Sequence, residues 1–342
     1  MNIKLYFAIA GMLISSAAMA KQITVINYGG EVAQAMRPSF VKPFEKDTNI
    51  SVITGSYAGG QAKVKAMVEA HHVTWNAVEI EADDLDRGCS RGLYEHIDWS
   101  TITHKSQLEP SAVTPCGVGI FKWATVLAYD TDSVKGKPHG WKDFWNVKKY
   151  PGKRGLRKTA RGTLEFALLA DGVPESKVYS VLATHAGVAR AFRKLDQLRP
   201  HIIWWQAGAQ PQQLLESGSV AMSSAFVGRI IAAEKAGQPL GITWNGAIGA
   251  YDYWAIPAGA PNKKLTERFI DYTVGVEPQL KFISRLPTGP ANRATLTKMT
   301  KSQLALIPNA PDHAGGILET SAKFWLQHGA YLDQRFAAWL SQ

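Results

Sequence analysis

Between residues 23 and 80, short β-branched runs alternate regularly with segments of helical periodicity. The runs 23–27, 50–53 and 78–80 are each closed by glycine or polar residues, as strands usually are. The segments between them, 33–44 and 61–70, carry apolar residues three or four positions apart, which predicts helices. This alternation predicts a mostly parallel sheet flanked by helices, so we expect an α/β fold.

The alternation continues beyond a long apolar, β-rich stretch at 117–129. We expect further strands at 202–205, 220–224, 242–244 and 253–257, and helices at 142–150, 163–169, 188–198, 212–216, 265–273, 278–283 and 322–340. A chain of 342 residues suits about two domains. Because no repeat and no low-complexity linker separates them, we expect the domain boundary to consist of short crossing strands.

The first 20 residues have the pattern of a cleavable signal peptide. Lys4 precedes an apolar run at 5–16, and Ala18-Met19-Ala20 supplies the small residues of a cleavage site. The alternative is an uncleaved membrane anchor, but a span needs about 20 apolar residues and this run is shorter. We therefore expect residues 1–20 to be removed and the mature chain to be a soluble periplasmic protein.

Export constrains how the two cysteines and the charge are interpreted. In an oxidising compartment, Cys89 and Cys116 are expected to form one disulfide, the alternative being two free buried thiols. The formal net charge of +10 would favour nucleic acid as a partner of an intracellular protein. For an exported chain we expect no nucleic-acid partner, and a basic face or an anionic partner remains open.

Small ligands of parallel α/β folds bind beyond the carboxyl ends of the strands, where the connecting loops converge. In this chain those loops are rich in aromatic, acidic and small residues; they span 28–31, 56–60, 81–84, 206–210 and 225–229. We therefore expect a small-molecule site formed by loops from both parts of the chain.

Several stretches together resemble a known family. They are Tyr28-Gly29-Gly30-Glu31, the F-E-x-x-T-x-I pattern at 44–50, the apolar segment 117–125, the loop 224–229, and Tyr251-Asp252-Tyr253-Trp254-Ala255-Ile256-Pro257-Ala258. The chain is similar in these respects to extracellular solute-binding proteins, the family that includes the spermidine/putrescine-binding proteins. The resemblance extends from residue 23 to the C-terminus.

The resemblance implies a periplasmic ligand carrier of an ABC importer, with no enzymatic activity, no cofactor and no metal. It implies two discontinuous lobes, 21–128 plus 252–298 and 129–251 plus 299–342, each a mostly parallel sheet with flanking helices. A ligand would bind in the cleft between them, and hinge closure would present the closed form to an inner-membrane permease. We expect a monomer. Asp252 occupies the position at which the family places an aspartate against a ligand amine.

One loop departs from the polyamine pattern. Polyamine binders place acidic residues where the second lobe opens, whereas the corresponding stretch 156–163 is basic. The main expectation is a ligand of the polyamine class. The alternatives are a zwitterion such as a γ-amino acid, whose carboxylate Arg161 or Arg229 would bind, and a small organic anion.

Further candidates are the acidic and aromatic residues at the strand ends. Carboxylates at these positions can bind a second amine; alternatively, they cap a helix or interact with its positive N-terminal end. Aromatic rings can attract the alkyl chain or the cation of a ligand; alternatively, they fill the core. The candidate acids are Glu31, Glu81 and Asp83, and the candidate cleft walls are Tyr28, Tyr57, Trp123, Phe226 and Tyr251. We expect Trp204 and Trp205 to point to opposite faces of one strand.

Competing motifs are weaker. The stretch 88–92 matches the G-x-S-x-G pattern of serine hydrolases through Ser90, but the residues before it are polar and helix-like rather than a strand. His71 and His72 are neighbours and cannot readily bind one metal together. The basic run 148–161 is interpreted as a solvated face, with docking to the permease as the alternative.

Overall fold

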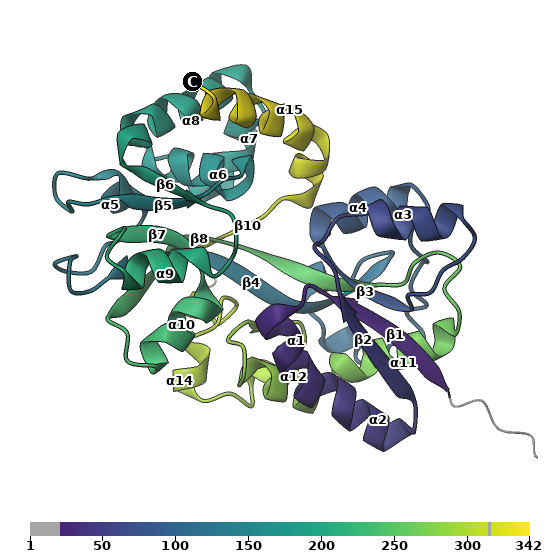
Figure 1. Cartoon of the computed structure of the whole chain (residues 1–342). Helices are drawn as coiled ribbons and strands as arrows, with labels where there is room; N and C mark the ends of the chain where they lie inside the picture. Colours follow the sequence, from purple (N-terminus) through teal and green to yellow (C-terminus); the bar gives the residue numbers. More distant parts are fainter. Residues whose placement is uncertain (1–20, 314–315) are drawn as a thin grey trace, which may run out of the picture.

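The computed structural model describes residues 21–313 and 316–342, so the predicted signal peptide lies outside the described residues. The strands form one mixed sheet in the order β2-β1-β3-β8-β4-β7-β5-β6, with β10 beside β8 and β9 beside β4 (Figure 1). Their bounds are β1 (Gln22–Asn27), β2 (Ser51–Ser56), β3 (Ala77–Glu81), β4 (Gly117–Asp130), β5 (Arg154–Arg157), β6 (Ile202–Trp205), β7 (Met222–Phe226), β8 (Leu240–Ala255), β9 (Gly289–Pro290) and β10 (Ile317–Glu319).

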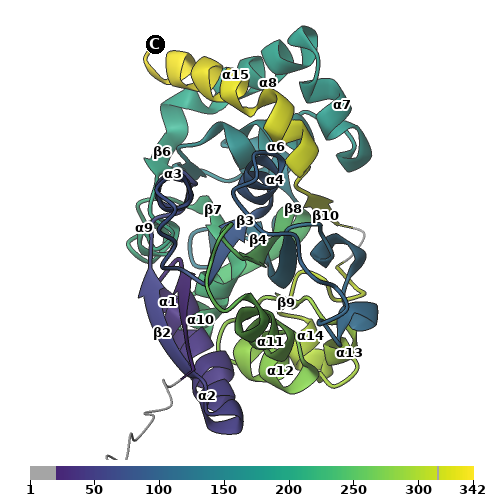
Figure 2. The same cartoon turned by 90° about the vertical axis from the view of Figure 1, so that its right-hand side faces the viewer.

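Helices cover both faces of this sheet, as Figure 2 shows from the side. Their bounds are α1 (Gly30–Met36), α2 (Lys42–Thr48), α3 (Ala62–Glu69), α4 (Ala82–Ser90), α5 (Trp141–Trp145), α6 (Ala160–Ala170), α7 (Val178–Leu182), α8 (His185–Leu198), α9 (Gln210–Glu216), α10 (Val227–Lys235), α11 (Lys263–Thr273), α12 (Val276–Ile283), α13 (Arg293–Leu296), α14 (Lys301–Leu304) and α15 (Ala322–Leu340). The predicted α/β fold class is confirmed.

The first part of the chain folds as its alternation predicts. Strand β1 pairs in parallel with both β2 and β3. The helical segment between β1 and β2 continues from α1 through a π-helical turn at Arg37–Val41 into α2. Phe40 and Phe44 on this segment are completely buried, because the apolar residues at helical spacing face the sheet.

The buried apolar side chains gather into two main clusters, one at each end of the sheet. The first is built around β1, β2, β3, α11 and α12, and it extends as far along the chain as Ile307 and Ala310. The second lies between β5, α6, α8 and α15. Strands β4 and β8 pair antiparallel along almost their whole length and run from one cluster to the other (Figure 1). The site described below lies where these crossing strands meet β3 and β7.

The second crossing strand is longer than its sequence predicts. We expected separate strands at 242–244 and 253–257, but β8 is continuous over 16 residues. Gly246 and Gly249 resemble strand breaks in the sequence, yet both serve the strand. Gly246 adopts a positive φ of 74°, and a side chain at Gly249 would lie 3.0 Å from the carbonyl oxygen of Trp123 on β4. Gly246 is therefore required by its positive φ, and Gly249 by the close approach of the two backbones. Neither residue ends the strand.

Candidate functional site

Three carboxylates share one face of the sheet at the junction of β3 and β8. These strands are antiparallel, and Glu81 on β3 lies opposite Asp252 on β8. Because alternate residues of a strand point to the same face, Glu79 shares this face with Glu81 and Asp252. Glu79 is completely buried and Asp252 is 6% exposed. A buried acidic cluster of this kind needs a cation or a proton to compensate its charge.

A cavity of about 270 Å³ opens above Asp252, between this part of the sheet and the residues that follow β7. Its walls come from both ends of the sheet; they are Tyr28, Gly29, Gly30, Glu31, Val32, Glu81, Phe121, Trp123, Ala124, Arg157, Gly208, Phe226, Val227, Gly228, Arg229, Asp252, Leu286 and Thr288. The strand-end loops at 28–31, 206–210 and 225–229 converge here as we expected.

Asp252 is held in place by the crossing strands. The indole Nε1 of Trp123, on β4, donates a hydrogen bond to Asp252 Oδ1 at 3.1 Å. Burial, together with the neighbouring carboxylates Glu79 and Glu81, raises the pKa of Asp252 well above its usual range. The carboxyl group is thus fixed in direction and short of positive charge, which suits it to bind an ammonium group.

Tyr28 forms part of the wall beside these acids. Its ring stacks on Tyr57, with the ring centroids 5.3 Å apart. Its backbone N–H donates to Glu79 Oε2 at 2.9 Å, and its hydroxyl oxygen accepts the backbone N–H of Glu81 at 3.0 Å. The turn that follows needs positive φ at Gly29 and Gly30, 74° and 57°, where glycine is the favoured residue. The Tyr28-Gly29-Gly30 motif thereby fixes the loop against the acidic cluster.

Across the cavity, Arg157 stands at the carboxyl end of β5. The centre of its guanidinium group lies 5.6 Å from the ring centroid of Phe226 and 5.8 Å from that of Trp205. Burial lowers its pKa from the usual value. Within residues 21–313 and 316–342, Arg157 forms no ion pair with a carboxylate. Sequence reasoning missed this residue, although the basic stretch 156–163 contained it.

The two arginines that were expected to bind a ligand carboxylate are already paired. Arg161 Nη1 lies 2.8 Å from Glu81 Oε2, and its Nη2 contacts Asp83. Arg229 Nη1 lies 3.2 Å from Glu31 Oε1. The first pair joins Arg161, which follows β5, to Glu81 at the end of β3. The second joins Arg229, which follows β7, to Glu31, which follows β1. Their role in this conformation is to tie the two sides of the cavity together, contrary to our expectation.

Arg229 lines this cavity, whereas Arg161 and three further predicted residues do not. Asp83 faces an adjoining hollow of about 620 Å³ that also contains Arg161. Tyr57 lies behind Tyr28 and donates its hydroxyl to the backbone carbonyl of Glu79 at 2.5 Å. Tyr251 neighbours Asp252 on β8 and points to the other face, since side chains alternate along a strand. The prediction of Tyr251 as a cleft wall is therefore wrong.

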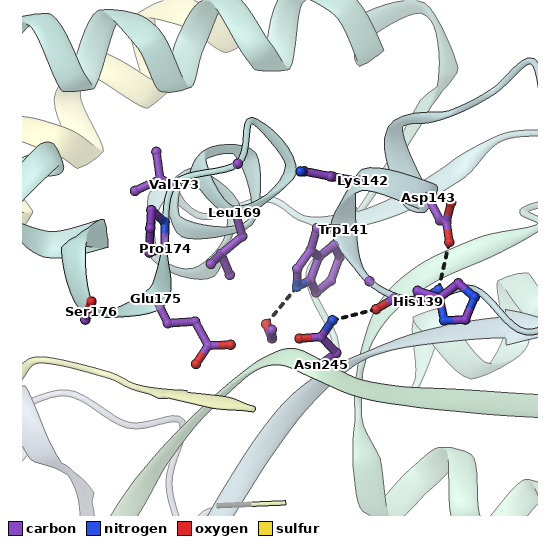
Figure 3. Close-up of a pocket in the computed structure, with 13 residues that line it drawn as sticks. His139, Trp141, Lys142, Asp143, Leu169, Val173, Pro174, Glu175, Ser176 and Asn245 are labelled. Carbon is purple, nitrogen blue, oxygen red and sulfur yellow. Dashed lines mark hydrogen bonds between the residues drawn. The ribbon is translucent and has the colours of Figure 1, made fainter. Parts of the chain in front are cut away.

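A larger hollow of about 800 Å³ lies beside α5 and the start of α7 (Figure 3). Some of its polar groups are paired with one another: Trp141 Nε1 donates to the Gly246 carbonyl at 2.7 Å, and Asn245 donates to the His139 carbonyl at 2.7 Å. The backbone N–H of His139 donates to Asp143 at 2.8 Å. Its walls come from one end of the sheet and its crossing strand, whereas the cavity above Asp252 is lined by strand-end loops from both ends of the sheet, and we take the latter as the candidate site.

The hydrolase pattern at 88–92 does not form a catalytic elbow. Ser90 is the last residue of helix α4 and its hydroxyl donates to the Arg87 carbonyl at 3.0 Å, so a helix and not a strand leads directly into it. Cys89 and Cys116 form a disulfide, as predicted. Although His96 lies close to both sulfur atoms, the disulfide leaves no thiolate to bind a metal there.

The disulfide should stabilise the fold measurably. It closes a loop of 27 residues, which corresponds to about 3.5 kcal/mol of chain entropy in the unfolded state. We expect the double variant Cys89→Ala/Cys116→Ala to lose roughly that free energy of unfolding in urea. A loss below about 1 kcal/mol would contradict a bonded pair in the exported protein.

A cavity above the crossing strands, lined from both ends of the sheet and flanked by two ion pairs, is typical of a ligand-binding protein. Residues 39–307 match the family of bacterial extracellular solute-binding proteins, and the chain belongs to that family. Among the described residues, no helix has the length and apolar character needed to cross a membrane.

Three relatives refine this assignment. A gamma-aminobutyric acid-binding protein from Pseudomonas aeruginosa is 45% identical over 334 residues, which cover 97% of this chain and 95% of that protein. A crystal structure of an ABC transporter substrate-binding protein from Bradyrhizobium japonicum matches with a TM-score of 0.87 at 32% identity, covering 93% and 99% of the two chains. The structure of a GABA receptor matches with a TM-score of 0.85 at 32% identity, covering 93% and 97%.

The chain is accordingly a bacterial extracellular solute-binding protein and not an enzyme. The polyamine branch, from which our resemblance was drawn, is more distant. The spermidine/putrescine-binding protein of Salmonella typhimurium is 24% identical over 246 residues, covering 69% of this chain and 68% of that protein. The broader family assignment is confirmed, and the comparisons favour the zwitterionic alternative over the polyamine class.

Proposed function

We propose that this protein binds a short ω-amino acid of the γ-aminobutyric acid class in the periplasm and delivers it to an ABC permease. One observation carries the proposal: the cavity has a buried carboxylate, Asp252, on one wall and, on the other, Arg157, which pairs with no carboxylate of the described residues. Such a ligand has one ammonium and one carboxylate group, separated by a short apolar chain.

The ammonium group would bind at Asp252. An ammonium ion donates three hydrogen bonds, and Asp252, Glu81 and the ring of Tyr28 all face the cavity. A charge-assisted hydrogen bond of this kind is worth about 1.5–3 kcal/mol. Because the acidic cluster includes Glu79 beneath Asp252, a cation gains more there than at a lone exposed aspartate.

The carboxylate would bind at Arg157. Its planar guanidinium group can donate two parallel hydrogen bonds to one carboxylate. Phe226 and Trp205 pack beside it, which limits its motion and excludes water. Arg161 and Arg229 would act indirectly by holding the two sides of the cavity together through Glu81 and Glu31.

The size and charge of the cavity argue for a short ligand. A volume of about 270 Å³ is at the lower limit of small-molecule sites, which usually measure roughly 300–1,000 Å³. A diamine would place its second ammonium group against Arg157, where like charges repel. Two relatives whose names refer to GABA, at 45% and 32% identity, are more similar to this chain than the spermidine/putrescine-binding protein at 24% identity.

Other parts of the proposal follow from the sequence and the family. We propose that residues 1–20 direct export, that the protein acts as a monomer, and that it contacts the permease in a closed form. We also propose two lobes that divide near residues 128 and 252, with the final boundary placed after Ala310 rather than at 298. The packing of Ile307 and Ala310 in the first apolar cluster supports that change.

A thermal-shift screen tests the proposed function directly. The mature protein is mixed with γ-aminobutyrate, putrescine, spermidine, succinate and butylamine. At 100 times its dissociation constant, a ligand stabilises the fold by about 2.7 kcal/mol, which gives an easily measured rise in melting temperature. We expect γ-aminobutyrate to give the largest rise. A larger rise with putrescine or spermidine would restore the polyamine class, and a rise with succinate alone would indicate an anion binder.

A further inference from the structure

Glu79 neighbours Asp252 beneath the cavity but is not among the residues that line it. It is completely buried in the middle of β3. Its Oε2 accepts the backbone N–H of Tyr28 at 2.9 Å. Its Oε1 is also buried, and no hydrogen-bond donor reaches that atom in the part of the chain that the structure describes. A buried carboxylate oxygen without a donor is costly, so this atom needs an explanation.

The charged and titratable groups around Glu79 are acidic or neutral. Asp252 faces it from β8 and Glu81 from β3, while Tyr28 and Tyr57 face it from the loops after β1 and β2. From β4, Trp123 contributes only a neutral N–H, which is directed at Asp252. Among the ion pairs of residues 21–313 and 316–342, none involves Glu79 or Asp252.

Two adjacent buried carboxylates without a cation cannot both be ionised at low energetic cost, and a single proton between them removes the repulsion. The same proton would satisfy Glu79 Oε1, because the side chains of Glu79 and Asp252 can hydrogen-bond to each other once one of them is protonated. Consistent with this, burial raises the pKa of Glu79 to about 7 and raises that of Asp252 well above its usual range.

We propose that Glu79 and Asp252 share one proton in the ligand-free cleft, and that the ammonium group of the ligand replaces this proton. This inference rests on the proposed function, since it concerns the same ligand amine. On binding, the carboxyl proton passes to solvent, the ammonium group keeps its three protons, and its positive charge now compensates the pair. Glu79 is therefore a positioning residue that acts on the ligand through Asp252.

The shared proton determines how the affinity for the ligand changes with pH. A proton must leave on binding wherever the pair is protonated, so affinity rises with pH and levels off once the pair is ionised without ligand. Below the raised Glu79 pKa of about 7, the dissociation constant of γ-aminobutyrate should fall by up to roughly tenfold for each unit by which the pH rises. The ligand itself does not titrate between about pH 5.5 and 8.5, because its carboxyl and amino groups titrate well outside that range.

Isothermal titration calorimetry with γ-aminobutyrate, in buffers of different ionisation enthalpy, counts the protons released. We expect close to one proton near pH 6, below the Glu79 pKa of about 7, and fewer at pH values where the ligand-free pair is ionised. In Glu79→Gln, whose amide oxygen can still accept the Tyr28 N–H, we expect less proton release near pH 6 than in the unmodified protein and an affinity that varies less with pH, because Asp252 loses a neighbouring charge that helps to raise its pKa.

Glu165 supplies a matched control. It too is completely buried, and burial raises its pKa to about 7, but it lies in α6, outside the cavity. It accepts hydrogen bonds from Trp325 Nε1 and from the backbone N–H of Gly162, each at 2.9 Å. Glu165→Gln therefore removes an equivalent buried acid. We expect it to keep the proton release of the unmodified protein, whatever its effect on affinity.

The outcomes separate this inference from the proposed function. Binding of γ-aminobutyrate near pH 6 without proton release overturns the shared proton and leaves the ligand class standing. If γ-aminobutyrate binds at no pH, the proposed function fails, and infrared spectroscopy of the ligand-free protein then decides the inference. Near pH 6, below the pKa of about 7, Glu79→Gln should reduce the protonated-carboxyl band, and an unchanged band overturns the proposal.

Discussion

Replacing Asp252 by asparagine should nearly abolish binding of γ-aminobutyrate while leaving the fold at least as stable. Removing one partner of a buried, hydrogen-bonded charge pair costs about 2–5 kcal/mol of binding free energy. The dissociation constant should therefore rise by roughly thirtyfold to several thousandfold. The asparagine oxygen can still accept the Trp123 N–H, and the variant relieves the repulsion with Glu79 and Glu81. Calorimetry measures the affinity, and thermal unfolding without ligand measures the stability.

The opposite directions of these two effects make the prediction specific. A structural role for Asp252 would lower affinity and stability together. Asp86→Asn is a suitable control, because Asp86 lies on the neighbouring helix α4 and is not among the residues that line the cavity. It removes the same charge, and its affinity should stay within about threefold of the unmodified protein. A comparable loss in Asp86→Asn, or a threefold loss or less in Asp252→Asn, would contradict the proposed amine site.

The fold was predictable where local pattern and tertiary structure agree. From residue 23 to 80, β-branched strands alternate with amphipathic helices, and each element buries the face that its own periodicity indicates. The crossing strand β8 was not predictable in full. In the sequence alone, Gly246 and Gly249 indicate turns, because the elements that pack against them are not visible there. The reasons lie more than 100 residues away in the chain, where the β4 backbone approaches Gly249 and Trp141 of α5 leaves no room for a side chain at Gly246.

The acidic and aromatic part of the site could also be predicted. Tyr28, Glu81 and Trp123 line the cavity together with Phe226 and Asp252. Strand ends converge at one edge of a parallel sheet, so Tyr28, Glu81 and Phe226 are sound candidates whatever the ligand. Trp123 and Asp252 lie within the crossing strands, and for Asp252 the family resemblance supplied the signal. Whether these residues bind the ligand in the roles we assign them remains a prediction.

The basic run 148–161 shows what sequence reasoning could not resolve. It was interpreted as a solvated face, and its lysines at 148, 149, 153 and 158 are indeed exposed. Its arginines behave differently: Arg154 is completely buried and donates to backbone carbonyls of Phe144 and Tyr150, while Arg157 and Arg161 are half-buried. A guanidinium group can satisfy several buried acceptors, whereas a lysine keeps its charge in water.

Glu79 was missed for a related reason, although a signal was available. An acid between Val78 and Ile80 could belong to a strand with one solvated face. In a parallel sheet covered by helices on both faces, however, every strand residue is buried, so a charged one demands a functional or structural partner. The βαβαβ pattern already predicted such a sheet, and the position of Glu79 could have been inferred from it.

Replacing Arg157 by methionine should weaken γ-aminobutyrate binding about as strongly as the loss of Asp252. Methionine keeps an apolar stem against Phe226 and Trp205 and removes the group that would bind the ligand carboxylate. The loss should again be about 2–5 kcal/mol, because it leaves a buried carboxylate unpaired. Butylamine, which has no carboxylate, should bind as well as before or better, since a buried positive charge has been removed from its path.

The reversal of ligand preference distinguishes recognition from folding. Arg157→Lys should recover only part of the affinity, because an ammonium group cannot form the two parallel hydrogen bonds of a guanidinium. Lys158→Met removes the same charge from the next, exposed residue, which does not line the cavity, and it should leave both ligands unaffected. Equal losses for γ-aminobutyrate and butylamine in Arg157→Met would mean that Arg157 supports the shape of the cavity. The carboxylate would then have to bind elsewhere, and Arg229, released from Glu31, would be the next residue to test.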